Sequence, residues 1–378
     1  MTSPIPARTA PRSRLLERAA ALLDNRVTAA LLYPRRVPDY LELVDPLLAR
    51  HETRARISEI RRETERAVTL VLEPSLRFDG YRAGQHATLT VELDGVRRTR
   101  TFSFSSAPET GAVTMTVQAR PGGLVSTWAV ERALPGDVVV LGEAGGAMVL
   151  PDELPDELLF VAGGSGVTPI ASLLESLVAR GYRGRARCVV YVRERATALL
   201  ADRLEALGSR MEDLRVCFSV TGEAPSPGQL EGHFRPEHLE AVGIDPERAH
   251  VYVCGPEGLR DDVRRFFHAR GLGARVLSEA FTARMPVRAP RGGARHGVNF
   301  ARSGRVAIGD EDTPLLEQAE RAGLAPRHGC RQGLCHSCEC TLATGTVEDL
   351  QTGALTDEPG RKIRLCVTVP RSDVTVAV

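Results

Sequence analysis

Long apolar segments are missing from this sequence of 378 residues. No apolar run approaches the roughly 18 residues that a membrane-spanning helix needs. The opening stretch, MTSPIPARTAPRSRLLERAA, contains neither a hydrophobic signal core nor a small-residue cleavage site. We therefore expect a cytoplasmic protein. Lysine is almost absent as well, since Lys362 stands alone, and without a Walker lysine a P-loop nucleoside triphosphatase is excluded.

An excess of charge of either sign is also missing. The 49 Lys and Arg residues are balanced by 48 Asp and Glu residues, which leaves a formal net charge of +1. A nucleic-acid-binding surface requires clustered basic residues, so nucleic acid is excluded as a partner. The sequence shows no internal repeat, and its length predicts two to four domains at roughly 100–200 residues each.

The hydrophobic pattern changes several times along the chain. Residues 1–52 read as a helical extension with an apolar stripe over residues 15–32, followed by prolines. Residues 53–151 alternate polar and apolar residues between Gly and Pro turns, which predicts an antiparallel β-barrel. Residues 152–284 combine buried strands with helices and predict a parallel α/β domain. We interpret 285–294 as a linker and 295–378 as a small α+β domain with one helix.

The cysteines concentrate at the C-terminal end. Of eight cysteines, five follow residue 329, and four of these lie in HGCRQGLCHSCEC at 328–340. The spacing C-x4-C-x2-C followed by a distant cysteine is typical of a plant-type [2Fe–2S] ferredoxin, whereas zinc sites usually supply two close pairs. The predicted ligands are Cys330, Cys335, Cys338 and Cys366, with zinc or disulfides as alternatives. Cys340 is interpreted as a core residue, although its position also permits it to replace Cys366 as a ligand.

Two stretches in the predicted barrel have the residues to bind a flat, phosphorylated cofactor. In RTFSFSS, Arg100 can bind a diphosphate, the ring of Phe102 can stack on a flat cofactor, and Ser103 offers a hydroxyl. In PGGLVSTW, Gly123 permits close backbone approach, and Ser126 and Thr127 stand at a helix start that can receive phosphate. Taken separately, each stretch also reads as an ordinary strand or turn.

Two stretches of the α/β domain point to a nucleotide. GGSGVTP at 163–169 follows an apolar strand and opens a helix, so its backbone N–H groups can receive a pyrophosphate. It is not the Rossmann fingerprint, because Pro169 occupies the third glycine position. Thr168 is expected to be the helix N-cap and Gly181 to end the helix. VYVCGPEGL ends a parallel strand with Cys254 at the carboxyl edge, where open α/β sheets bind ligands.

These motifs in this order, R-x-F-S, G-G-x-V-S, G-G-S-G-V-T-P, C-G-P, E-x-F and the cysteine loop, resemble the ferredoxin–NADP reductase family in its versions fused to a C-terminal ferredoxin. The resemblance covers residues 53–378. Similar chains include phenylacetyl-CoA epoxidase reductase subunits, phthalate dioxygenase reductases and the reductases of bacterial acyl-CoA desaturases. The last group is the most similar, because VPDYLELVDPLLA in the extension resembles theirs. The family implies a FAD-binding β-barrel, an NAD(P)H-binding α/β domain and a β-grasp ferredoxin.

The resemblance also implies roles for individual residues. Ser103, Cys254 and Glu279 are implied as the residues beside the reacting atoms, and Phe102 replaces the usual tyrosine against the flavin ring. The pattern favours FAD over FMN. Arg193 and Arg195 are implied to pair with the 2′-phosphate of NADPH, with NADH as the alternative. The implied cofactor-binding residues are Arg100, Thr101, Phe102, Ser103, Gly123, Val125, Ser126 and Thr127 for the flavin, Gly163, Gly164, Gly166, Thr168, Arg193, Arg195, Cys254, Gly255 and Pro256 for the nicotinamide nucleotide, and Phe281 beside the flavin.

The sequence therefore predicts a flavin iron–sulfur oxidoreductase that passes electrons from NAD(P)H through FAD to a [2Fe–2S] cluster, and then to a desaturase or oxygenase component. The flavin is needed because the nicotinamide gives two electrons and the cluster takes one at a time. Alternatives are a cytochrome P450, a ring-hydroxylating dioxygenase or a hybrid-cluster protein as acceptor, or a regulatory redox sensor. We expect a monomer whose N-terminal helices pack on the flavin domain or contact a partner or a membrane surface.

Overall fold

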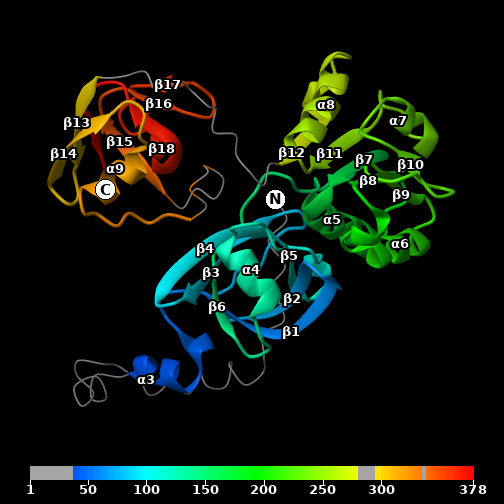
Figure 1. The fold of residues 1–378 in the computed structure, drawn as a ribbon, viewed down its shortest axis with the longest axis horizontal. Helices are drawn as coiled ribbons and strands as arrows, with labels where there is room; N and C mark the ends of the chain where they lie inside the picture. Colours follow the sequence, from blue (N-terminus) through cyan, green and yellow to red (C-terminus); the bar gives the residue numbers. More distant parts are fainter. Residues whose placement is uncertain (1–36, 280–293, 330, 332, 334–337) are drawn as a thin grey trace. The chain divides into compact units, whose positions relative to one another are not determined.

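The computed structural model describes residues 37–279, 294–329, 331, 333 and 338–378. The chain forms two compact units, residues 1–280 and 281–378 (Figure 1). The apolar stripe expected at 15–32 lies outside the described residues. Within them, the extension contains helix α3 (Val37–Val44) and the 3-10 turn η1 (Pro46–Leu48). No helix in the described part of the chain has the length and apolar character needed to cross a membrane.

The described extension packs on the barrel. Arg54 at the start of the first barrel strand pairs with Glu42 of α3 at 2.7 Å, and Arg56 pairs with Asp45 at 2.9 Å. Leu47 and Leu48 of η1 are buried. The two ion pairs join residues 42–45 to the first barrel strand, whereas the packing expected for the helices at 15–32 stays a prediction.

An antiparallel barrel follows, as the alternating pattern predicted. Its strands are β1 (Arg54–Thr64), β2 (Ala67–Pro74), β3 (His86–Leu93), β4 (Val96–Ser103), β5 (Val113–Gln118) and β6 (Val138–Leu141). The sheet order is β4-β3-β6-β1-β2-β5, and a bridge between Phe104 and Met115 joins its two edges. Helix α4 (Leu124–Glu131) lies against this sheet, and the turn η2 (Pro108–Thr110) precedes β5 (Figure 1).

The second half of this unit is a parallel α/β domain. Its strands are β7 (Glu157–Gly163), β8 (Arg185–Val192), β9 (Leu214–Val220), β10 (Leu230–Glu231), β11 (His250–Cys254) and β12 (Val276–Glu279), in the order β10-β9-β8-β7-β11-β12. The helices are α5 (Val167–Ala179), α6 (Ala201–Arg210), α7 (Glu237–Val242) and α8 (Glu257–His268), with 3-10 turns η3 (Gly164–Gly166), η4 (Arg195–Thr197) and η5 (Gly273–Arg275). Every strand pair is parallel, which confirms the predicted fold class of this domain.

The start of α5 differs from the expectation. The helix begins at Val167, so Thr168 lies inside its first turn and its hydroxyl donates to the carbonyl oxygen of Ser165 at 3.0 Å. The reason is the 3-10 turn η3, which brings the chain into helical geometry before Thr168 is reached. The expected end is correct, since Gly181 follows the helix with a φ of +63°.

The second unit contains a mixed β-sheet packed around one helix. Its elements are β13 (Arg295–Phe300), β14 (Arg305–Asp310), α9 (Leu315–Arg321), β15 (Glu339–Thr344), β16 (Val347–Asp349), β17 (Leu355–Thr356), β18 (Lys362–Arg364), η6 (Leu365–Val367), β19 (Thr368–Pro370) and β20 (Val374–Val376). The larger sheet runs β14-β13-β20-β15-β18, with β13 and β20 parallel. Leu315, Leu316 and Ala319 of α9 are buried against this sheet. The predicted α+β fold of this domain is thus confirmed.

Candidate functional site

The end of β4 presents buried oxygens that no described residue satisfies. Thr101 and Ser103 lie two positions apart, so their side chains share one face of the strand. Neither the Oγ1 of Thr101 nor the Oγ of Ser103 has a hydrogen-bond partner among the described residues. Arg100 next to them is exposed, and its guanidinium donates to the carbonyl oxygen of Thr99 at 2.7 Å. Phe102 is half-buried and packs on the barrel core.

Glu279 of β12 reaches the same place from the α/β domain. Its Oε1 lies 2.6 Å from the Nδ1 of His86, and His86 pairs directly with Ser103 across β3 and β4. Its other oxygen, Oε2, is buried and has no partner in the described part of the chain. An unsatisfied buried oxygen costs about 1–3 kcal/mol. The oxygens of Thr101, Ser103 and Glu279 together therefore fit a polar, flat ligand edge such as that of a flavin.

His86 is a site residue that the sequence analysis missed. It faces Glu279 from β3, and a Cβ atom on Gly146 would lie 3.0 Å from its Nδ1, so the loop at Gly146 closes tightly over the ring. Nothing in the local pattern GQHATLTV marks this histidine. Its position opposite Ser103 in the β3–β4 hairpin is the one signal that was available.

The turn before α4 is built on Gly123, which is the N-cap of that helix. A Cβ atom on Gly123 would lie 2.5 Å from the Oγ of Ser126. That hydroxyl donates to the carbonyl oxygen of Gly123 at 3.2 Å and accepts the N–H of Arg120 at 3.3 Å. Ser126 therefore shapes the turn, Val125 is buried in the core, and Thr127 is half-buried beside them. The exposed start of α4 has the backbone geometry to receive a diphosphate.

The two nucleotide motifs of the α/β domain pack directly on each other. β7 and β11 are neighbours, so their carboxyl ends meet at one edge of the sheet. A Cβ atom on Gly166 would lie 2.2 Å from the carbonyl oxygen of Cys254, and one on Gly163 would lie 2.7 Å from Pro256. Glycine is therefore required at both positions, because any side chain would push the two loops apart. Gly164 adopts a φ of +52°, and Gly255 lies beside Gly163.

Cys254 is fully buried at this edge. Burial raises the pKa of its thiol well above the ordinary value, and the nearby carboxylate of Glu279 raises it further. β11 and β12 place Cys254 and Glu279 directly opposite each other. Cys254 is consequently a neutral thiol beside the carboxylate that contacts His86.

The two arginines after β8 differ in their surroundings. Arg195 donates to Glu205 at 2.6 Å, and its guanidinium lies 4.1 Å from the ring centroid of Phe218. Arg193 is exposed. Of the two, Arg193 therefore has the side chain that is open to solvent, whereas Arg195 is held against the sheet.

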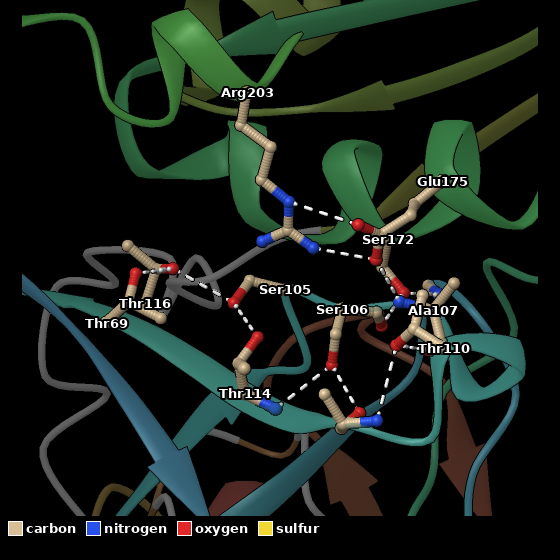
Figure 2. A network of polar contacts seen from close by, with 12 residues as sticks. Thr69, Ser105, Ser106, Ala107, Thr110, Thr114, Thr116, Ser172, Glu175 and Arg203 are labelled. Carbon is tan, nitrogen blue, oxygen red and sulfur yellow. Dashed lines mark hydrogen bonds and ion pairs between the residues drawn. The ribbon is translucent and has the colours of Figure 1, made fainter. Parts of the chain in front are cut away.

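A polar network joins α5 to the segment that follows β4 (Figure 2). Glu175 accepts the N–H of Ala107 at 2.7 Å and pairs with Arg203 of α6, whose Nη2 lies 2.7 Å from its Oε2. One turn earlier, the Oγ of Ser172 donates to the carbonyl oxygen of Ser106 at 2.6 Å. The hydroxyls of Thr69, Ser105, Thr114 and Thr116 continue this network into the barrel. The segment that follows Ser103 is thereby hydrogen-bonded to helix α5, whose N-cap is Gly166.

In the second unit, two of the four predicted cluster ligands lie among the described residues. Cys338 and Cys366 are both buried, and the backbone N–H of Gly333 donates to the Sγ of Cys366 at 3.2 Å. Such N–H···S bonds are typical of iron–sulfur ligands. Cys340 is also buried and lies opposite Ile363 in the core. Cys330, Cys335 and Phe281 lie outside the described residues, so their roles stay predictions.

Family models match both units. The oxidoreductase NAD-binding domain matches residues 160–265, and the 2Fe-2S iron-sulfur cluster binding domain matches residues 299–371. A protein of Mycobacterium tuberculosis named NADPH oxidoreductase is 33% identical over 365 residues, which cover 94% of this chain and 92% of that protein. The stachydrine N-demethylase reductase subunit of Rhizobium meliloti is 28% identical and covers 80% of this chain and 90% of its own length.

A solved structure is similar in fold over most of the chain. Phthalate dioxygenase reductase, described as a modular structure for electron transfer from pyridine nucleotides to [2Fe-2S], matches with a TM-score of 0.57 and 22% identity. The match covers 86% of this chain and 97% of that structure. At this identity the similarity concerns the fold, and it extends over both units.

Proposed function

Because this chain belongs to the ferredoxin–NADP reductase family of flavin oxidoreductases with a C-terminal [2Fe–2S] ferredoxin domain, we propose that it takes electrons from NADPH and delivers them singly to an oxygenase or desaturase component. The contact between Glu279 and His86 carries this proposal. It brings the carboxyl edge of the nucleotide sheet to the end of β4, where Ser103 lies. A two-electron donor and a flavin would meet at this point.

The residues of this chain bind and orient the groups that react. Arg100 and the start of α4 would hold the flavin diphosphate, Phe102 would cover one face of the ring, and the oxygens of Thr101 and Ser103 would meet its polar edge. When bound, FAD accepts two electrons together and releases them one at a time. The buried thiol of Cys254 and the carboxylate of Glu279, which lie opposite each other, would stand beside the nicotinamide. Cys330, Cys335, Cys338 and Cys366 would hold the cluster.

NADPH is proposed as the donor over NADH. Arg193 supplies an exposed guanidinium after β8, and an arginine at this position suits a 2′-phosphate. The Mycobacterium tuberculosis relative carries NADPH in its name, which supports the same choice. A relative from Escherichia coli that is 27% identical is named NADH oxidoreductase HCR, so NADH is the competing donor.

An oxygenase component is the proposed acceptor class. One relative is named as the reductase subunit of glycine betaine monooxygenase and another as the electron transfer component of toluate 1,2-dioxygenase. The clustered cysteines fit a reducing compartment such as the cytoplasm. A desaturase is the second proposed acceptor, because the VPDYLELVDPLLA segment at 37–49 resembles the corresponding segment of desaturase reductases.

The proposal is tested on the purified full chain. We expect visible absorption from both a flavin and a [2Fe–2S] cluster, bleached by NADPH without oxygen, and rapid turnover with ferricyanide or cytochrome c. A colourless protein that contains zinc would refute the proposal. A coloured protein that NADPH reduces but that turns over too slowly to support catalysis would favour a regulatory redox sensor.

A further inference from the structure

Arg364 lies beside the cysteine loop and contacts it through the backbone. Its guanidinium donates to the carbonyl oxygen of Gly333 through Nη1, and its Nη2 lies 2.6 Å from the Oδ2 of Asp349. Gly333 is the residue whose N–H donates to the Sγ of Cys366. The side chains of Arg364 and Asp349 are each about one-fifth exposed, so solvent screens this pair only partly.

Asp349 is itself held in place from the other side. Its Oδ1 accepts the backbone N–H groups of Gln351 at 2.9 Å and Thr352 at 3.1 Å. Burial acts to raise the pKa of Asp349, but the bonds from Arg364, Thr352 and Gln351 outweigh it and leave the pKa below its ordinary value. Asp349 is therefore a fixed carboxylate that anchors the guanidinium.

The backbone conformation and the surroundings of Gly333 both favour glycine at this position. Its φ is +70°, and a Cβ atom there would lie 2.8 Å from the Oε1 of Gln351. Both backbone polar groups of Gly333 have a partner, because its carbonyl oxygen accepts from Arg364 and its N–H donates to the Sγ of Cys366. Loss of the carbonyl contact would release the peptide and weaken the N–H···S bond.

We propose that Arg364, anchored by Asp349, is a positioning residue that holds the Gly333 N–H on the Cys366 sulfur and thereby raises the reduction potential of the cluster. This inference rests on the proposed [2Fe–2S] site. A hydrogen bond to a ligand sulfur stabilises the reduced cluster, which carries one more negative charge. The arginine tunes the last carrier of the electron path without binding it.

In Asp349→Asn, the loss of a negative charge and the loss of the anchor for Arg364 should change the reduction potential of the cluster in opposite directions. Removing a negative charge near the cluster should raise its potential by electrostatics alone. Releasing Arg364 should lower the potential, because the Gly333 N–H loses its support. Arg364→Lys keeps the positive charge but lacks the two-pronged geometry that bridges Asp349 and Gly333. Arg361→Leu is the matched control, since Arg361 is exposed and pairs with Glu358 at 3.9 Å.

The experiment is a redox titration of the full chain, followed by cluster absorption and by the electron paramagnetic resonance spectrum of the reduced state. We expect Asp349→Asn and Arg364→Lys each to lower the equilibrium constant for reduction of the cluster about tenfold. For a one-electron couple this lowers the reduction potential by about 59 mV. Both should alter the resonance spectrum, and Arg361→Leu should alter neither property. A raised or unchanged potential in Asp349→Asn, or a wild-type potential in Arg364→Lys, would overturn the inference. Absence of cluster absorption in the wild-type chain would instead refute the proposed function.

Discussion

Replacing Glu175 tests whether α5 and the segment after β4 form one rigid connection. Glu175 accepts one backbone N–H and pairs with one guanidinium, and its side chain is 15% exposed against 27% for Arg203. A charge-assisted hydrogen bond contributes about 1.5–3 kcal/mol, and partial exposure of Arg203 reduces the upper figure. We expect Glu175→Ala to lower the free energy of unfolding by roughly 3 kcal/mol, because the Ala107 N–H and Arg203 both lose their partner.

The measurement is urea unfolding of the full chain, followed by the fluorescence of Trp128 in α4 and by far-UV circular dichroism. Trp128 is the sole tryptophan and reports on the barrel, whereas circular dichroism reports on all elements. A double-mutant cycle with Arg203→Ala should give a coupling of about 1–2 kcal/mol. We also expect the two signals to lie closer together in the wild-type chain than in Glu175→Ala, since the two domains lose a shared connection in the variant.

Glu205→Ala is the matched control. Glu205 also forms a salt bridge with an arginine, Arg195, at 2.6 Å, but the side chain of Glu205 is 54% exposed. An exposed pair contributes at most about 1 kcal/mol. Equal shifts of the urea midpoint for Glu175→Ala and Glu205→Ala would refute the reasoning, because they would show that the position of Glu175 between the two domains has no energetic effect.

Three further outcomes follow from the same contacts. Cys340→Ser should keep the cluster absorption and Cys366→Ser should lose it; the opposite pattern in iron content would reassign the fourth ligand. Gly166→Ala should weaken NADPH binding at least tenfold by calorimetry, because its Cβ atom would overlap the carbonyl of Cys254, whereas Gly208→Ala in the open part of α6 should leave binding unchanged. Arg193→Ala should raise KM for NADPH roughly 10–100-fold with little effect on NADH, as one charge-assisted bond to phosphate predicts; an equal rise for both donors would contradict a contact to the 2′-phosphate.

The motifs at the carboxyl edge were predictable because topology brings them together. In a parallel sheet every strand ends at the same edge, so GGSG after β7 and CGP after β11 were both expected at that edge, and they touch because β7 and β11 are neighbours. The spacing of the cysteines likewise predicted the ferredoxin domain without any knowledge of its sheet. Local patterns were therefore sufficient wherever a motif and its partner belong to one sheet or one loop.

The contacts between domains were not predictable in this way. His86 meets Glu279, and Glu175 meets Ala107, across surfaces whose docking no periodic pattern encodes. The same limit applies to Arg364, whose role depends on the path of a loop far from it in sequence. The misplaced N-cap at Thr168 has a smaller cause, since a 3-10 turn before the helix has no distinct composition.

The network on α5 also has a consequence for protein engineering. Ser172 and Glu175 bond to the backbone of Ser106 and Ala107, so the partner of each side chain is largely main chain whose path depends on the barrel. A chimera could exchange the nucleotide domain alone in order to change donor preference. Its new α5 would then face the barrel's loop at residues 106–107 without side chains matched to the path of that loop. The barrel and the nucleotide domain are therefore best transplanted as one module, whereas the boundary after residue 280 offers a natural point for exchanging the ferredoxin.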